Sequence, residues 1–180
     1  MFPRVTEILA DVGLGLDVSR IPSGVLEAGR ARGAAVHAAI EAIVYGYDGE
    51  ATIPSEIAPY LDAYRKFVAE SGYETIATEI EVVNTRWRYR GHPDSVGWLG
   101  GARIIPDWKT GDDTGSEYQL AGYRAAWNAE HPTELVTGIA VVNLRDNGTY
   151  RFTEISADEA EPIFLAAVIV FWAKRSRDAA

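Results

Sequence analysis

The chain has 180 residues, of which 47% are hydrophobic and 24% are charged, the composition of a single soluble globular domain with a substantial core. It contains no cysteine, which excludes disulfides, thiolate zinc sites and iron–sulfur clusters. Its net charge of −9 argues against a general nucleic-acid binder, which would usually be basic. The same charge is compatible with an enzyme whose clustered carboxylates hold divalent cations.

The first residues give no sign of export. They read Met-Phe-Pro-Arg-Val-Thr-Glu, with no basic segment followed by an apolar one, so we expect no signal peptide. The longest apolar run, residues 163–172, is shorter than the roughly 20 residues that a membrane-spanning helix needs. We therefore predict a cytoplasmic protein that has no membrane partner.

Helices are predicted throughout the first third of the chain. A short helix over residues 3–12 is ended by Gly13, and a longer one with an apolar stripe at helical spacing runs over residues 23–45. A third helix begins near Ser55 and stops at Gly72, a residue type that favours helix ends.

The middle of the chain changes to the period-two pattern of strands. Gly100-Gly101 predicts a turn between the last two strands, and a helix is expected over residues 116–127. The four predicted strands cover residues 75–84, 87–91, 94–99 and 103–108.

The last third predicts a strand hairpin and a helix. Residues 135–142 are almost continuously apolar, as expected of a strand buried on both faces. Asp146-Asn147-Gly148 predicts a hairpin turn, and a final helix begins near Ser156. The order of elements predicts an α/β fold with a mixed sheet in one domain. We divide residues 1–180 into a mainly helical part (1–72), a sheet core with an inserted helix (73–155) and a C-terminal helix (156–180).

Asp107 and Lys109 are the first candidates for chemistry. They are two residues apart on a predicted strand, so their side chains point to the same face. They follow Ile104-Ile105, which places them at the end of a buried strand, where charged groups need partners or a metal ion. The simpler interpretation is an ion pair at the end of a strand.

Asp94 lies thirteen residues before Asp107, across the predicted Gly100-Gly101 turn. An antiparallel hairpin of that length can bring the two carboxylates together, and two adjacent carboxylates form a hard oxygen site for Mg²⁺ or Mn²⁺. A bound metal ion lowers the pKa of its water and so supplies a nucleophile. Lys109 can orient that water or stabilise negative charge in the transition state.

Pro93-Asp94 followed by Asp107-Trp108-Lys109 resembles the signature of the PD-(D/E)XK nuclease superfamily. Two flanking segments are more specific. Residues 33–37 resemble the helical histidine motif of the RecB-like branch, and residues 118–123 resemble its Gln-x-x-x-Tyr motif. The order and spacing of these elements agree over residues 33–123, and residues 5–9 look like small phage-encoded members. The resemblance implies a restriction-endonuclease-like core with a mixed central sheet flanked by helices.

The resemblance also implies a role for each matched residue. Asp94 and Asp107 would be carboxylate ligands of one or two Mg²⁺ or Mn²⁺ ions, and His37 would add a nitrogen ligand that slightly favours Mn²⁺. The backbone carbonyl of Trp108 would be a further ligand. Lys109 would be the catalytic lysine. A histidine such as His37, taken alone, is more often a helix-packing residue than a ligand.

Supporting roles follow for residues around this centre. Gln119 and Tyr123, one helical turn apart, would support the site or contact the DNA backbone. Glu79 would match an acidic ligand on the first core strand, although Glu81 is expected on the same face and the pair could simply be solvated.

Two arginines precede the histidine motif on the same predicted helix. Arg30 and Arg32 lie within two turns of His37, where they could contact DNA phosphates. The alternative is that they are solvated helix arginines, which are common.

The sequence also departs from larger relatives of the family. Many RecB-like nucleases carry a cysteine-ligated iron–sulfur cluster, which a chain without cysteine cannot hold. No G-x-x-x-x-G-K-[ST] loop is present, so we expect no nucleotide cofactor. The resemblance to phage recombination nucleases suggests a recombination partner protein, and the apolar residues 164–172 could face a second subunit of a homo-oligomer.

These observations predict a Mg²⁺- or Mn²⁺-dependent DNA nuclease that hydrolyses phosphodiester bonds. An exonuclease acting on linear ends of single- or double-stranded DNA is favoured by analogy with the RecB-like and phage enzymes. Three alternatives stay open: a structure-specific endonuclease, a catalytically inactive DNA-binding or scaffold protein with a nuclease fold, and a phosphohydrolase acting on small substrates.

Overall fold

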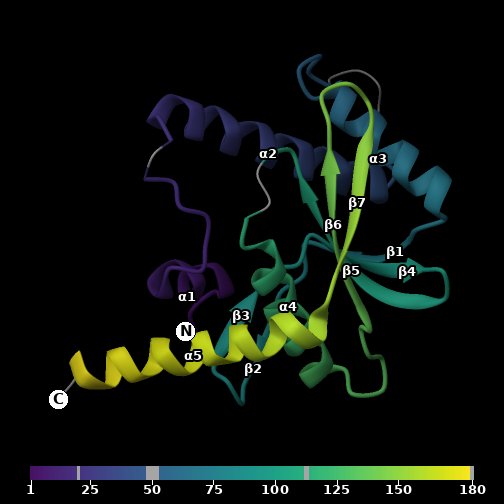
Figure 1. Cartoon of the computed structure of the whole chain (residues 1–180). Helices are drawn as coiled ribbons and strands as arrows, with labels where there is room; N and C mark the ends of the chain where they lie inside the picture. Colours follow the sequence, from purple (N-terminus) through teal and green to yellow (C-terminus); the bar gives the residue numbers. More distant parts are fainter. Residues whose placement is uncertain (20, 48–52, 112–113, 179–180) are drawn as a thin grey trace.

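The computed structural model describes residues 1–19, 21–47, 53–111 and 114–178, which form a mixed α/β fold (Figure 1). The helices are α1 (Val5–Val12), α2 (Ser23–Val44), α3 (Ala58–Ser71), α4 (Ser116–Glu130) and α5 (Ala157–Asp178). The strands are β1 (Glu74–Thr78), β2 (Val82–Asn84), β3 (Tyr89–Gly91), β4 (Ser95–Leu99), β5 (Ala102–Lys109), β6 (Gly138–Leu144) and β7 (Tyr150–Ile155).

The centre of the fold is a five-stranded sheet with the order β1-β4-β5-β6-β7. Neighbouring strands are antiparallel except for β5 and β6, which are parallel. A parallel pair needs a crossover, and α4 supplies it. The predicted fold class, a mixed central sheet flanked by helices, is therefore confirmed.

Helices cover both faces of the sheet, because the inner strands are apolar on both sides. Ile105 and Ile139 belong to a core that includes residues of α1, α4 and α5. Trp108 and Val142 belong to a second core with α2 and α3, where the Trp108 ring lies edge-on to Phe67. Figure 1 shows α1 beside α5, away from α2 and α3. None of the described helices is long and apolar enough to cross a membrane.

The prediction of one strand over residues 75–84 is wrong. The chain forms β1 and β2 instead, and β2 pairs with β3 in a separate two-stranded sheet. The break lies at Glu79, which has a left-handed φ of 49°. The Asp94 carbonyl oxygen accepts hydrogen bonds from Thr78 Oγ1 (2.7 Å) and from the Glu79 backbone N–H (3.2 Å). These bonds turn the chain out of the sheet directly after β1.

Other predicted boundaries shift for local reasons. The first helix begins at Val5 because the Arg4 backbone N–H bonds to the Glu7 carboxylate at 3.0 Å, which closes the helix start. The strand predicted over 135–142 begins at Gly138. The residues before it are held by α4, where Asn128 Oδ1 accepts a hydrogen bond from the Val136 N–H at 2.8 Å.

The β4–β5 hairpin has the turn that the sequence predicts. Gly100 and Gly101 connect the strands with φ values of 57° and 84°, which glycine adopts without steric cost. The register pairs Gly97 with Ile104, so continuing it toward the open end of the hairpin places Asp94 level with Asp107. This register is what brings the two carboxylates to one place.

Gly97 allows β4 to pass close to β1. A Cβ at this position would lie 2.4 Å from the Glu74 carbonyl oxygen and 2.5 Å from the Tyr73 ring. We expect Gly97→Ala to lower the free energy of unfolding by about 1–3 kcal/mol, because the backbone of β1 must move. Gly29→Ala, on α2 with open space around its Cβ, should instead stabilise the protein by about 0.5–1 kcal/mol. Urea unfolding of both variants checks this, and equal stabilities would contradict it.

Candidate active site

Charged side chains from four parts of the fold meet at the carboxyl end of β5. Asp107 and Lys109 come from β5 itself, and Asp94 comes from the residue before β4. His37 comes from the middle of α2, and Glu79 follows β1. The structure therefore brings together residues that are up to 72 positions apart in the chain, all of which the sequence singled out.

Asp107 and Lys109 form the innermost pair. The Lys109 Nζ lies 2.7 Å from Asp107 Oδ2, and the Asp107 side chain is only 2% exposed. A carboxylate buried to this degree needs a charged partner, because water cannot solvate it. The pair thus has the geometry of the simpler interpretation, an ion pair, in which the Lys109 side chain is partly exposed and the Asp107 side chain is buried.

Asp94 lies against the backbone of β5. Its Oδ2 accepts a hydrogen bond from the Trp108 backbone N–H at 2.9 Å, and its side chain is 10% exposed. Burial and the negative charge of Asp107 raise the pKa of the Asp94 carboxyl to about 7, although the charges of His37 and Lys109 and the bond from Trp108 act in the opposite direction. Two neighbouring carboxylates in a buried place favour a cation between them.

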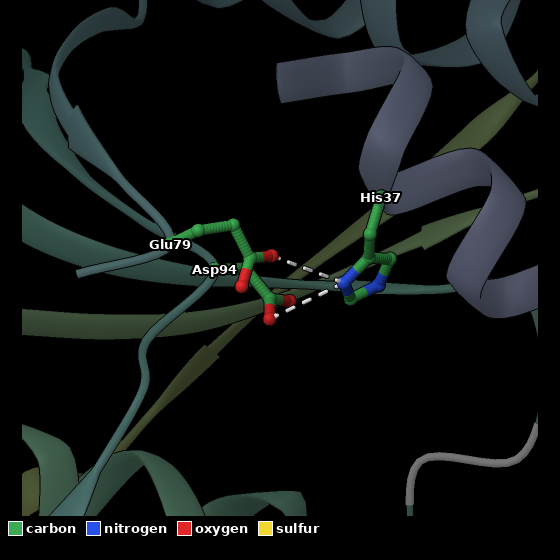
Figure 2. A group of neighbouring side chains, drawn as sticks. All are labelled: His37, Glu79 and Asp94. Atoms are coloured by element: carbon green, nitrogen blue, oxygen red, sulfur yellow. Dashed lines mark ion pairs between the residues drawn. The ribbon is translucent and has the colours of Figure 1, made fainter. Parts of the chain in front are cut away.

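His37 is held in one orientation by the backbone. Its Nε2 lies 2.8 Å from the Trp108 carbonyl oxygen and donates to it, so the other ring nitrogen faces the carboxylates. Figure 2 shows His37 Nδ1 between Asp94 Oδ1, at 3.4 Å, and Glu79 Oε1, at 3.7 Å. A histidine that binds a metal ion through one nitrogen commonly donates its other N–H to a backbone carbonyl in this way.

The acidic surroundings change the protonation of His37. Burial lowers the pKa of its imidazole, but this effect is outweighed by the ion pair with Glu79, the charge of Asp94, the bond to the Trp108 carbonyl and the charge of Asp107, which together raise the pKa to about 9. At neutral pH the ring is therefore an imidazolium. A positive charge already occupies the centre of the acidic cluster, where a metal cation would be attracted for the same reason.

The cluster can provide ligands for a divalent cation. The His37 nitrogen and one carboxylate oxygen each from Glu79 and Asp94 all lie within 4.8 Å of one another. Two hard oxygen donors and one imidazole suit Mg²⁺ or Mn²⁺. Asp107 lies deeper and is joined to Lys109, and the Trp108 carbonyl accepts the His37 bond. That these two also act as ligands stays a prediction.

Gln119 and Tyr123 lie on α4 beside the carboxylates. Gln119 Nε2 donates to the Tyr123 hydroxyl oxygen at 2.9 Å. Burial raises the pKa of the Tyr123 phenol above its usual range, and the charges of Asp94 and Asp107 raise it further, so its hydroxyl stays protonated. Tyr123 is buried and Gln119 is partly exposed, and their supporting role stays a prediction.

Glu79 and Glu81 do not share a face, contrary to the expectation from an unbroken strand. Glu79 turns toward His37, whereas Glu81 lies 2.7 Å from Arg90 Nη1 and 3.8 Å from His92 Nε2. The left-handed backbone at Glu79 breaks the alternation on which the expectation was based. Glu79 is therefore the member of the pair that lies beside His37 and Asp94, and its role as a metal ligand stays a prediction.

A cavity of about 720 Å³ opens beside the cluster, between α1, α2 and the segment after β5. We call it the active-site hollow. Its lining includes three residues near the charged cluster, His37, Lys109 and Gln119, and it also includes Arg30. Sequence reasoning missed its apolar part, which includes Leu16 from the connection between α1 and α2. The sequence signal that could have indicated it is the presence of apolar residues in the glycine-containing connection between α1 and α2.

The pKa of Asp94 leads to a prediction about stability. Because the folded-state pKa (about 7) exceeds the ordinary value of 3.8, ionised Asp94 lowers stability increasingly as pH rises from about 4 to 7. In EDTA at pH 7.5, we expect Asp94→Asn to unfold with a free energy about 2–4 kcal/mol higher than wild type. Near pH 4 the difference should vanish.

Urea unfolding at both pH values provides the measurement. Asp62→Asn, at an exposed carboxylate of α3, is the matched control and should change stability by less than about 0.5 kcal/mol. A less stable Asp94→Asn protein at pH 7.5 would show that the carboxylate is not held at an electrostatic cost.

Comparison with solved structures identifies proteins of similar fold. A crystal structure of an alkaline exonuclease, LHK-Exo, in complex with dAMP superimposes with a TM-score of 0.50 at 14% identity, over 98% of this chain and 89% of the exonuclease chain. Another crystal structure, of LHK-Exo from Laribacter hongkongensis, gives a TM-score of 0.47 at 16% identity, over 69% of this chain and 67% of that one. No protein-family model and no curated protein matched the sequence. The chain thus shares a mixed α/β fold with an exonuclease.

Proposed function

We propose that this protein is a Mg²⁺- or Mn²⁺-dependent deoxyribonuclease of the PD-(D/E)XK superfamily, in its RecB-like branch, and that it acts as an exonuclease. The observation that carries the proposal is the cluster of Asp94, Asp107 and Lys109 with His37 at one strand end, beside the active-site hollow. The fold shared with an alkaline exonuclease supports the same activity without assigning it.

The donors fit a hard divalent cation. Glu79 and Asp94 would supply oxygen. His37 would supply Nδ1, since its Nε2–H is committed to the Trp108 carbonyl, and the cation would displace the proton that Nδ1 carries at neutral pH. When bound, the cation would lower the pKa of a coordinated water and offset negative charge on a phosphate. Burial and the charge of Asp107 raise the pKa of Asp94, as expected where negative charges lie close together. A bound cation would reduce this unfavourable interaction.

Lys109 would act on the phosphate or on the attacking water. Its Nζ is a cationic group in the lining of the hollow, and the ion pair with Asp107 holds it there. A positioned ammonium group stabilises the negative charge that develops on phosphate oxygens in the transition state. Asp107 thereby positions Lys109 through their ion pair. Tyr123, kept protonated, would add a fixed hydroxyl dipole behind the carboxylates.

The exonuclease assignment rests on the resemblance of the motifs and on the shared fold. The small α/β core formed by the described residues leaves little room within itself for a module that reads base sequence.

Removing the lysine tests the reaction. We expect wild type to degrade end-labelled linear DNA with Mg²⁺ or Mn²⁺ and not with EDTA, and we expect Lys109→Ala to lose roughly 100- to 1,000-fold in rate. Lys66→Ala, at an exposed lysine of α3, is the matched control and should keep the wild-type rate. Gel assays with single- and double-stranded, linear and circular DNA provide the measurement.

Each pattern of cleavage has a different meaning. Loss of linear DNA alone supports an exonuclease, and loss of circles indicates an endonuclease. No cleavage by wild type in any metal would favour the catalytically inactive DNA-binding protein, and hydrolysis of mononucleotide esters alone would favour the small-substrate phosphohydrolase. Cleavage unchanged by Lys109→Ala would reject the assignment of this site.

Metal binding can be measured without catalysis. At a Mn²⁺ concentration about 100 times the dissociation constant, binding to the folded state alone adds about 2.7 kcal/mol to stability, so the melting temperature should rise by several degrees. Asp94→Asn and His37→Ala should abolish most of this rise, because the first removes the negative charge of one of the three clustered donors and the second removes another donor entirely. Glu81→Gln, whose carboxylate pairs with Arg90, should preserve it. An unchanged rise in Asp94→Asn would place the metal elsewhere.

A further inference from the structure

A second hollow of about 460 Å³ lies next to the active-site hollow, at the carboxyl ends of β5 and β6. We call it the arginine hollow, because Arg32, Arg145 and Arg151 line it. Arg32, Thr110 and Gly111 belong to the walls of both hollows, so the two are neighbours. Sequence reasoning assigned no role to Arg145 or Arg151.

The sheet register fixes how far this hollow lies from Lys109. Lys109 pairs with Asn143 across the parallel β5–β6 ladder, and Asn143 pairs with Arg151 across the antiparallel β6–β7 ladder. Partners directly opposite each other point to the same face of a sheet, so the three form one row. Two interstrand spacings of about 4.8 Å place the Arg151 backbone roughly 10 Å from that of Lys109.

Two of the three arginines are held in place by contacts of their side chains. Arg151 donates from Nε and Nη2 to Asn143 Oδ1, at 3.2 and 3.0 Å, which aligns its guanidinium along the row. Arg32 reaches over from α2 and donates from Nη2 to the Thr110 carbonyl at 3.2 Å, with its guanidinium 5.6 Å from the centre of the Tyr60 ring. Arg145, at the end of β6, is exposed.

Charge sets this place apart from the chain as a whole. The net charge is −9, yet three arginines gather around one hollow, where Asp146 is the acidic residue among the described lining residues. Arg32 Nε is also buried without a hydrogen-bond partner among the described residues. Guanidinium groups bind phosphate oxygens through paired N–H donors, independently of base sequence.

We propose that the arginine hollow binds an internal phosphodiester of the DNA strand whose scissile phosphate lies at Lys109. The proposal rests on the proposed nuclease function and extends it by giving the strand a direction across the sheet, from Lys109 along the row to Arg151 and Arg145. The arginine hollow binds the DNA backbone beside the reacting phosphate. This attraction offsets the repulsion between DNA and the net negative charge of the protein. The contact carries no base specificity, as a degrading enzyme requires.

The test measures binding and cleavage separately. Fluorescent single-stranded 12-nucleotide DNA, with a 5′-phosphate or a 5′-hydroxyl, is titrated in EDTA at several salt concentrations. Arg145→Gln should weaken binding equally for two unrelated sequences and for both 5′ ends. It should also reduce the slope of log K against log salt by about 0.7, the value of one lost phosphate contact on a single strand.

Control variants separate charge from folding. Arg145→Lys keeps the positive charge and should keep the slope within about 0.2 of wild type, because counterion release depends on charge. Arg177→Gln removes the same charge from an exposed residue of α5 that is not among the residues lining either hollow, and it should leave the slope unchanged. In cleavage with Mn²⁺, Arg145→Gln should raise KM severalfold more than it lowers kcat.

The outcomes distinguish this inference from the function on which it rests. Wild type that cuts and binds DNA while Arg145→Gln shows an unchanged slope overturns the inference alone. An effect confined to 5′-phosphorylated DNA also overturns it, since the hollow would then hold a terminal phosphate. Wild type that neither binds nor cuts DNA rejects the proposed function, and the inference with it.

Discussion

Two carboxylates held together at a buried strand end are the constraint on which the rest of this structure depends. The β4–β5 register places Asp94 level with Asp107, and burial then makes their shared negative charge unfavourable, as the raised pKa of Asp94 records. Two cationic side chains offset this negative charge: Lys109 from β5, the strand of Asp107, and the His37 imidazolium from α2. The paired carboxylates lower the stability of the folded protein, and they form a site that attracts a cation.

The position of α2 across the end of β5 is the second requirement. Two of its side chains bond to consecutive parts of one backbone segment, His37 to the Trp108 carbonyl and Arg32 to the Thr110 carbonyl. The first bond aims Nδ1 at the carboxylates, and the second carries an arginine to the wall between the two hollows. One helix thus fixes a ligand for the proposed cation and a contact for the proposed strand. The Trp108 ring, packed against Phe67 on the face of the sheet that α2 and α3 cover, anchors the segment that both side chains bind.

An acidic protein can act on DNA only if its positive charge is local, and the structure shows where that charge lies. One row of residues crosses β5, β6 and β7 near the carboxyl ends of β5 and β6, and it consists of Lys109, Asn143 and Arg151. Parallel and antiparallel ladders both keep opposite residues on one face, so a row of this kind needs no loop to align it. Strands are among the stiffest supports that a fold offers, which suits a site where groups must be placed within fractions of an ångström.

The sequence by itself determined the chemical groups. The spacing of two residues put the Asp107 and Lys109 side chains on one face of a strand. The glycine turn made the hairpin that places Asp94 beside Asp107, and the helical pattern placed His37 on α2. The sequence determines these features because they follow local rules of strand, turn and helix geometry. Only the tertiary structure decided how they meet. The turn of the chain at Glu79 depends on bonds to the Asp94 carbonyl, and the ring orientation of His37 depends on the Trp108 carbonyl. The arginine hollow depends on pairing across β6. Such long-range backbone contacts leave no periodic trace in a sequence, so they had to be seen in space.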